Sequence, residues 1–551
     1  YTDIYARLKG AWTGVQDKLN SYWQAQDCAI RYRNYCLSHN LLDFSLVTEV
    51  YHRYLFPHPV YRRHFQARYR HLMVDNLEEN VPVAHEMIAW AMAQCESTVL
   101  AFDEGGGYRL FLGADAEGAL GIEKACNEET TLKTFLEGTR HVLAFSDVLR
   151  QTLRVESVPV SPDGVPNRGI ADRGGERYWI GMIHWVVARI TELLEKGIHA
   201  GEIAIIAPYV SEVMRFAIEE ELTAHGIDLY LLRPSTPLRE EPLIRGLLTL
   251  VLLGHPDWVL RIQGEAYSLP VEDVALALRT ALAGLDPIRS RYLAQAALPP
   301  GQRVLRDLSG SASDGASRDG LGRLWENVGY QVAERYEALR VWLSRYHEGD
   351  AEPADIFLSR AFGDLLSRPG YGFCDETARA RAYGRLVESA AKFRSAVGLD
   401  GAVDDDTVAR EYVQLVLEGT ASAEYLVDWP YPPREDAVIL APAYSYLTRD
   451  LRSSYQFWID LGSDGWTNRP NQPLTHPYVL SKRWPVGKPW RDIEEEQAKR
   501  DVLGKVVQGL AARCTKGVYL AFSELGIDGV EQRGQLQRAI VTVLSRMVAD
   551  G

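Results

Sequence analysis

Two short apolar runs in the chain each end in an acidic residue. His71–Asp75 reads H-L-M-V-D, and Thr98–Asp103 reads T-V-L-A-F-D. Buried parallel strands end in this way when their carboxyl ends face a binding site. A carboxylate there can hold Mg²⁺ against the phosphates of a nucleotide, so Asp75 is a candidate metal ligand and Asp103 a candidate nucleotide contact. Without a nucleotide, Asp75 is a helix N-cap or a surface acid, and both alternatives stay open.

The residues near these acids limit which reactions and ligands a site here could support. Asn76 directly follows Asp75, and an amide cannot act as a general base at neutral pH. Glycines 105–107 follow Asp103. They could cradle a phosphate with their N–H groups, but three glycines between short strands are more typical of a hairpin turn, which we expect. Arg513 either stabilises a phosphate as an arginine finger or pairs with the acids at 494–496.

Two further groups of side chains are candidates for binding single-stranded nucleic acid. The segment 61–71 (Y-R-R-H-F-Q-A-R-Y-R-H) is the densest basic and aromatic run. Its arginines could follow a phosphate backbone, or the segment is a solvated helix with its rings turned inward. Rings near the C-terminus could stack on bases or pack in the core. The candidate residues in these two groups are Arg62, Arg63, Arg68, Tyr444, Trp466 and Trp484.

The elements that must position these residues follow from apolar periodicity. The first 70 or so residues predict amphipathic helices, and the two acid-ended strands with a helix between them predict a βαβ unit. A second α/β region begins near residue 178, and a helical region of about 160 residues then interrupts the strands. The expected segments are strands 202–207, 229–232, 437–441, 456–461 and 518–522, helices 81–94, 178–195 and 211–225, and a flexible linker at 309–320.

Composition limits the class of protein. The chain has 551 residues, of which 46% are hydrophobic and 24% charged, so it should fold into several domains. Its net charge of −14 means that a nucleic acid would have to be held by a local basic groove. The six cysteines form no C-x-x-C pair, which disfavours zinc or iron–sulfur sites. No long apolar run or leader is evident, so we expect a cytoplasmic protein without membrane contact.

The order of these elements and several local sequences resemble the UvrD/Rep type of superfamily 1 DNA helicases. The segment 42–46 (L-D-F-S-L) precedes Asp75 as a similar element precedes the family's Walker B strand, and 71–80 resembles the Walker B motif itself. The segment 102–114 resembles the family's next motif. Segment 197–205 resembles the entry to its second motor domain, 237–253 resembles the segment after that entry, and 494–520 resembles its final motif.

This resemblance implies an α/β fold of two RecA-like P-loop-type motor domains with inserted helical subdomains. Residues 1–60 would be a helical remnant of the first insertion, and 61–165 the C-terminal part of the first motor domain. The second motor domain would comprise 166–266 and 427–551, on either side of a helical insertion at 267–426.

The resemblance also implies a degraded nucleotide site, formed by Asp75, Asn76, Asp103 and Gly106. Asn76 stands where the family has a water-positioning Glu, and Gly106 where it has a Gln that senses the γ-phosphate. Arg513 alone remains as an arginine finger. The phosphate loop G-x-x-x-x-G-K-[S/T] is absent from the sequence, so ATP and Mg²⁺ are expected only if a phosphate loop lies upstream of Tyr1.

The function that the resemblance implies is action on single-stranded DNA in repair or recombination, with a degraded ATP site in this chain. The alternative is a catalytically inactive helicase-fold scaffold that guides DNA inside a larger complex with a protein partner. An α/β protein unrelated to nucleic acids is the third hypothesis.

Overall fold

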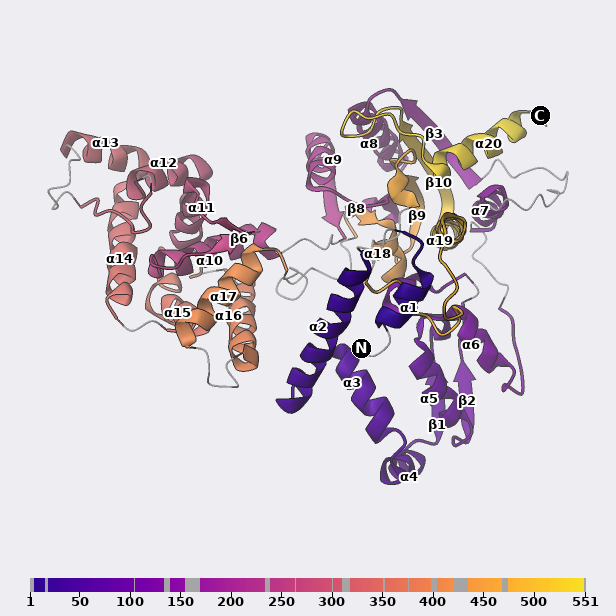
Figure 1. Cartoon of the computed structure of the whole chain (residues 1–551). Coiled ribbons are helices and arrows are strands. Elements are labelled where there is room, and N and C mark those ends of the chain that lie inside the picture. The colour runs from indigo at the N-terminus through magenta and orange to yellow at the C-terminus, as the bar shows by residue number, and fades with distance from the viewer. Residues whose placement is uncertain are drawn as a thin grey trace. The chain divides into compact units, whose positions relative to one another are not determined.

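A computed structural model describes most of the chain as two compact units (Figure 1). Unit 1 comprises residues 1–234 and 431–551, and unit 2 comprises residues 235–430. The described residues are 4–14, 18–103, 105–132, 139–153, 169–232, 238–262, 264–299, 301–309, 318–349, 352–374, 376–397, 404–420, 435–467 and 474–549.

Unit 1 begins with helices and a two-stranded sheet. Strands β1 (His71–Val74) and β2 (Ser97–Leu100) pair in parallel, and α5 (Pro82–Met92) connects them. This confirms the predicted βαβ unit. One face of the sheet packs on α5 and α6 (Ala116–Glu123) around Leu77 and Ile88. The preceding helices are α1 (Ile4–Ala11), α2 (Lys18–Ser38), α3 (Phe44–Val50) and α4 (Pro59–Arg68).

A six-stranded parallel sheet forms the centre of unit 1, in the order β3-β10-β9-β4-β8-β5. The middle strand β4 reads I-A-I-I-A and is buried along its whole length, as expected for a parallel strand covered on both faces. The strands are β3 (Ile170–Glu176), β4 (Ile203–Ala207), β5 (Asp228–Leu231), β8 (Ala437–Pro442), β9 (Ser453–Trp458) and β10 (Cys514–Ser523).

Helices cover both faces of this sheet. The helices α8 (Trp179–Glu195) and α9 (Glu212–Ala224) pack on one face. The opposite face is covered by α7 (Thr139–Leu153), α18 (Ala443–Thr448), α19 (Asp492–Ala512) and α20 (Gln535–Ala549). The structure is therefore a mixed α/β fold with a doubly wound parallel sheet.

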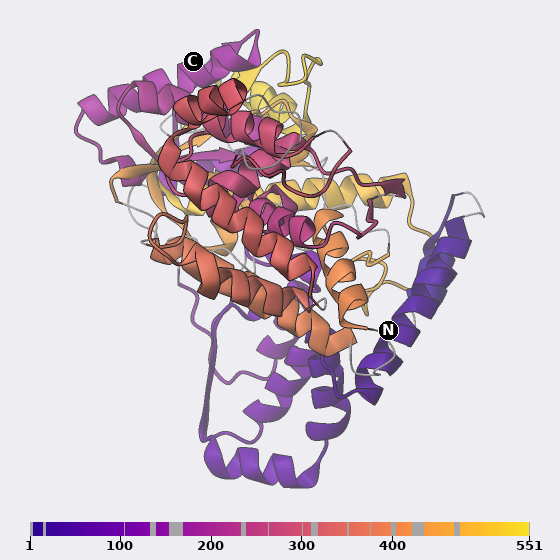
Figure 2. The same cartoon turned by 90° about the vertical axis from the view of Figure 1, so that its left-hand side faces the viewer.

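Unit 2 is mainly helical, with its own hydrophobic core. Figure 2 shows its helices, coloured crimson to orange, lying alongside one another. They are α10 (Pro242–Gly254), α11 (Val271–Ala281), α12 (Pro287–Ala297), α13 (Arg318–Val328), α14 (Tyr330–His347), α15 (Ala354–Ala361), α16 (Thr377–Val397) and α17 (Asp405–Leu417), with a two-stranded ribbon of β6 (Arg261–Ile262) and β7 (Glu265–Ala266).

Several boundaries differ from those expected from the sequence. Unit 2 begins at Ser235 rather than at 267, because α10 packs into the helical core. Within the expected linker 309–320, residues 310–317 lie outside the described part of the chain, and Arg318 already begins α13. Strand β3 was not expected at all, because its sequence I-A-D-R-G-G-E lacks apolar alternation. Among the described helices, none is long and apolar enough to cross a membrane.

Candidate functional site

The predicted metal ligand Asp75 lies on the surface just after β1. Its carboxylate accepts a hydrogen bond from the N–H of Asn76 at 2.9 Å. Asn76 has a left-handed backbone (φ 49°) and is exposed, so the chain turns sharply here. The described residues gather no group of three or more His, Cys, Asp or Glu side chains that could hold a metal. Asp75 is an exposed acid in this structure, and its role as a metal ligand beside a nucleotide stays a prediction.

A buried glutamate, which the sequence analysis did not single out, lies between the ends of β1 and β2. Glu78 is almost wholly buried, and one carboxylate oxygen accepts the N–H of Asp103 at 3.0 Å. Burial raises the pKa of Glu78, although the hydrogen bond from Asp103 opposes the shift. A Cβ at Gly106 would lie 2.6 Å from Cγ of Glu78. Gly106 is therefore needed for close packing against this carboxyl group.

The glycine segment does not form the expected hairpin. It leads from β2 into a short 3₁₀ helix, η3 (Tyr108–Leu112). The carboxylate of Glu79 accepts the N–H groups of Gly107 (3.0 Å), Tyr108 (2.8 Å) and Arg109 (2.9 Å).

Asp103 completes the same pattern. Its carboxylate accepts the N–H of Gly105 at 3.1 Å, and its carbonyl accepts that of Gly106 at 3.0 Å. The N–H groups that a phosphate would need are thus already bonded to this chain's own oxygens. The residues present do not fit a nucleotide phosphate at this segment.

Arg513 lies at the C-terminal end of α19, and its guanidinium is held in place. It pairs with Asp450 at 3.0 Å and donates to the carbonyl of Gly509 at 3.1 Å. The guanidinium also lies over the ring of Tyr108, 5.8 Å from its centre. The prediction that Arg513 pairs with the acids at 494–496 is wrong. Its ion-pair partner is Asp450, which precedes β9. The arginine has structural contacts on three sides.

The glycine segment and α19 meet around Tyr108. This tyrosine is buried in the core of the six-stranded sheet, and burial raises its pKa to about 12. A Cβ at Gly509 of α19 would lie 2.1 Å from the Tyr108 hydroxyl. The structure thus brings Asp103, Gly106 and Arg513 into the neighbourhood of Tyr108.

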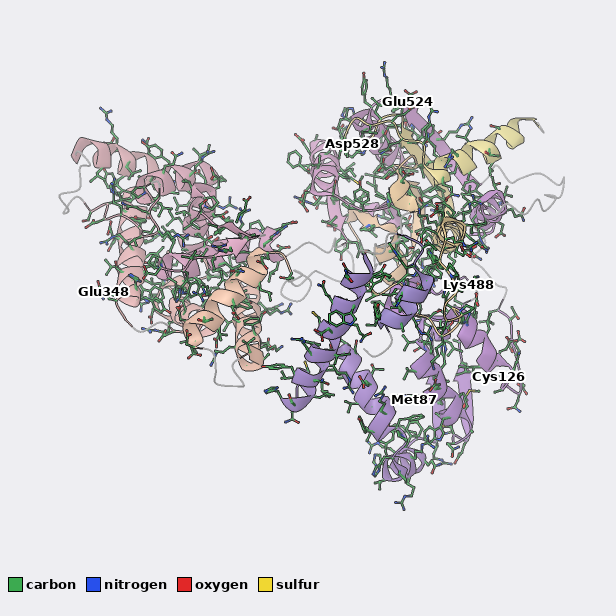
Figure 3. All side chains as sticks on the ribbon, viewed as in Figure 1. Met87, Cys126, Glu348, Lys488, Glu524 and Asp528 are labelled. Atoms are coloured by element: carbon green, nitrogen blue, oxygen red, sulfur yellow. The ribbon has the colours of Figure 1, made fainter. Side chains whose placement is uncertain are left out.

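The predicted base-stacking rings lie in different environments. Trp466 is only 4% exposed, and its indole N–H donates to the carbonyls of Ile459 and Asp460. Its prediction as a DNA contact is wrong, because the ring is part of the core. Tyr444 is half-buried against the same core. Trp484 is half-buried, with Lys488 (labelled in Figure 3) 4.4 Å from its ring centre.

The three predicted arginines of α4 divide into two kinds. Arg62 packs over the rings of Phe56 and Trp90, and its guanidinium donates to the Phe56 carbonyl at 3.0 Å. Arg63 and Arg68 are exposed, and neither forms an ion pair with any residue that the structure describes. Only these two present free charge to a ligand.

Neither a protein-family model nor a curated protein matches this chain.

The carboxyl edge of the six-stranded sheet holds a second group of polar residues, which the sequence analysis missed. Strands β4 and β9 are neighbours. From β4 the chain continues through α9 on one face, and from β9 through α19 on the other. Open parallel sheets bind ligands at such a switch point, outside the carboxyl ends of the strands.

Asp460 lies at this switch point, two residues after β9. It is 4% exposed and has a left-handed backbone (φ 55°). Burial raises its pKa to about 6, against the opposing effect of hydrogen bonds from Gln532 and Ser463. Its Oδ1 atom has no hydrogen-bond partner among the described residues.

Other buried acceptors surround the same loops. The side-chain oxygens of Ser523, Gln532 and Gln537 are also buried without a partner in the described part of the chain. A Cβ at Gly462 would lie 2.7 Å from Oε1 of Gln537. Figure 3 shows Asp528, in the loop after β10, at this end of the sheet. These oxygens would accept hydrogen bonds from ordered water or from a ligand rich in N–H groups.

A signal for Asp460 was present in the sequence. F-W-I-D at 457–460 is an apolar run that ends in an acid, the same pattern that singled out Asp75 and Asp103. Applied to every strand, that rule would have found the carboxylate at the switch point. Glu78 and Glu79 had no such signal, because their importance comes from contacts with residues about 25 to 30 positions away.

Proposed function

We propose that this protein binds single-stranded DNA as a catalytically inactive relative of the UvrD/Rep-type helicases, and that it guides the strand for a partner that performs the chemistry. The observation that carries the proposal is the set of exposed rings and free arginines on the N-terminal helices. Trp23 is 58% exposed and Tyr54 63% exposed. Tyr32 and Tyr69 are about half exposed, and Arg63 and Arg68 are exposed on α4.

Exposed rings and arginines together are the chemistry of sequence-tolerant binding to single strands. Each ring can stack on any base, and each arginine can displace a counterion from a phosphate. This local chemistry has to act against the net charge of −14, which opposes the approach of DNA at long range. The affinity for DNA should therefore fall as the salt concentration rises, unless stacking of the rings on bases adds to it.

The proposal of an inactive motor is supported by the glycine segment, whose N–H groups are already hydrogen-bonded within the chain. Glu79 and Asp103 occupy its N–H groups, and Arg513 is paired with Asp450. Two RecA-like motor domains remain part of the proposal, in which the β1–β2 unit would correspond to the first motor domain and the six-stranded sheet to the second.

The test is fluorescence anisotropy of a short labelled thymidine oligonucleotide at several salt concentrations. Replacing Arg63 and Arg68 together by Gln should reduce the magnitude of the log–log salt slope by about 1.4, since each arginine contributes about 0.7 on a single strand. Trp23→Ala should weaken binding by about tenfold at every salt concentration, because stacking is not screened. The matched control is the pair Arg452→Gln and Arg533→Gln, which removes two exposed arginines elsewhere.

Two outcomes would contradict the proposal. One is the absence of binding at low salt, which favours the α/β protein without a nucleic-acid role. The other is binding that the control pair weakens as much as the α4 pair, because the arginines of α4 would then have no special part in it.

A further inference from the structure

A pocket of about 500 Å³ lies within unit 2, away from the residues discussed above. It is formed where the end of α11 and the turn after it meet the segment that precedes α16, with the start of α10 at one side. Pockets of this size hold small organic molecules.

Backbone contacts fix the shape of the pocket. Leu282 and Tyr371 form an isolated antiparallel bridge, and the N–H of Gly372 donates to the carbonyl of Ala281 at 2.9 Å. A Cβ at Gly372 would lie 2.0 Å from the carbonyl oxygen of Thr280, so only glycine allows this approach. Because main chain forms these walls, the pocket is present before any ligand binds.

Two arginines, Arg279 and Arg379, and one acid, Glu376, line the pocket, so its charged side chains carry a net positive charge. Arg279 lies exposed at its edge and forms no ion pair with the described residues. Arg379, near the start of α16, also lines the pocket. Its guanidinium lies over the ring of Phe373 and 3.8 Å from the exposed carboxylate of Glu376. The Arg335 guanidinium packs against Gly370, another lining residue. In a chain with a net charge of −14, this local excess of arginine favours an anion.

Apolar side chains form one part of the remaining lining, beside Thr280, Cys374 and backbone. Leu243, Leu276 and Leu285 contribute aliphatic surface. The ring of Tyr371 lies among them, and its hydroxyl donates to the carbonyl of Arg335 at 3.4 Å, which leaves the ring as the part available for contact. The anion should therefore carry an apolar or aromatic body.

We propose that this pocket binds a small phosphomonoester with an aromatic ring. Arginines from two different segments border the pocket, and the three terminal oxygens and double charge of a phosphate dianion offer more to two guanidinium groups than the two oxygens and single charge of a carboxylate. The apolar lining receives the ring.

The experiment is isothermal titration calorimetry of the whole chain with phenyl phosphate, and with inorganic phosphate, benzoate and phenol as separate arms. Phenyl phosphate should bind at least about tenfold more tightly than the other three, because each of them lacks either the dianion or the ring. Arg279→Gln and Arg379→Gln should each weaken binding by about fivefold or more. Arg291→Gln, in neighbouring α12 and outside the lining, should leave it unchanged.

Absence of saturable binding of phenyl phosphate would overturn the proposal, as would binding that neither arginine variant affects. Tighter binding of benzoate than of phenyl phosphate would overturn the assignment of a phosphomonoester. Arg279 forms no ion pair in the described part of the chain, so Arg279→Gln should fold normally. If Arg379→Gln does not fold, Arg279→Gln alone still tests the pocket. DNA binding is measured in parallel, so failure of the proposed function can be told apart from failure of this proposal.

Discussion

At the scale of single residues, the buried carboxyl group of Asp460 stands out because the fold retains it at a cost. Its pKa of about 6 means that the folded protein holds a proton on this group more tightly than the unfolded chain does. Its Oδ1 atom has no hydrogen-bond partner among the residues that the structure describes. Carboxyl groups with raised pKa values at the carboxyl edge of a parallel sheet are candidates for ligand contact.

Asp460→Asn should stabilise the protein above pH 7 and have little effect near pH 4. Below pH 4 the group is protonated in both the folded and unfolded states, so it costs nothing. Between about pH 4 and pH 6 the unfolded chain ionises this group while the folded state keeps it protonated, so the penalty grows over this range and levels off above pH 6 at about 2–3 kcal/mol. Thermal unfolding followed at pH 4.5 and pH 8 measures the difference. A loss of stability in the variant at pH 8 would show that the charged form is favoured by contacts.

At the scale of elements, the glycine segment is held by acidic side chains from the turn after β1. Glu79 acts as the N-terminal cap of η3 and receives three N–H groups. Glu78 and Gly106 fit closely beside it. These contacts connect the end of β1 to the segment after β2, and they position Tyr108 against α19.

Glu79→Ala should destabilise the protein by about 1–3 kcal/mol, because three N–H groups lose a charged acceptor and at least two of them are shielded from water. Chemical denaturation measures the free energy of unfolding. Glu123→Ala is the control, since Glu123 is an exposed glutamate in the neighbouring helix α6. Equal stability of the two variants would mean that the cap contributes nothing.

At the scale of the whole molecule, hydrolysis of a nucleotide requires a phosphate loop, a metal ligand and a water-positioning group in one place. This sequence contains no G-x-x-x-x-G-K-[S/T] motif, and Asp75 is followed by Asn76, whose amide cannot act as a general base. Unit 2 has a hydrophobic core of its own.

The chain should therefore release no phosphate from ATP above background, with or without single-stranded DNA. A coupled phosphate-release assay checks this, and Asp75→Ala is the matched variant. Turnover near 1 s⁻¹ that is lost in Asp75→Ala would contradict the prediction and restore the motor hypothesis.

The sequence by itself determined the elements whose burial is continuous or periodic. Strand β4 and helix α8 follow from their apolar patterns, because a local pattern reports which side of a segment avoids water. The parallel βαβ unit of β1, α5 and β2 followed in the same way.

Only the tertiary structure decided which residues meet. In the folded chain Arg513 pairs with Asp450, and Trp466 is buried. Strand β3 forms one edge of the sheet, and the carboxylate of Glu79 accepts the N–H groups of the glycine segment. Each of these outcomes depends on a partner that lies elsewhere in the chain. The physical reason is that hydrogen bonds and ion pairs are set by three-dimensional proximity, whereas a sequence pattern carries only the average polarity of a residue's surroundings.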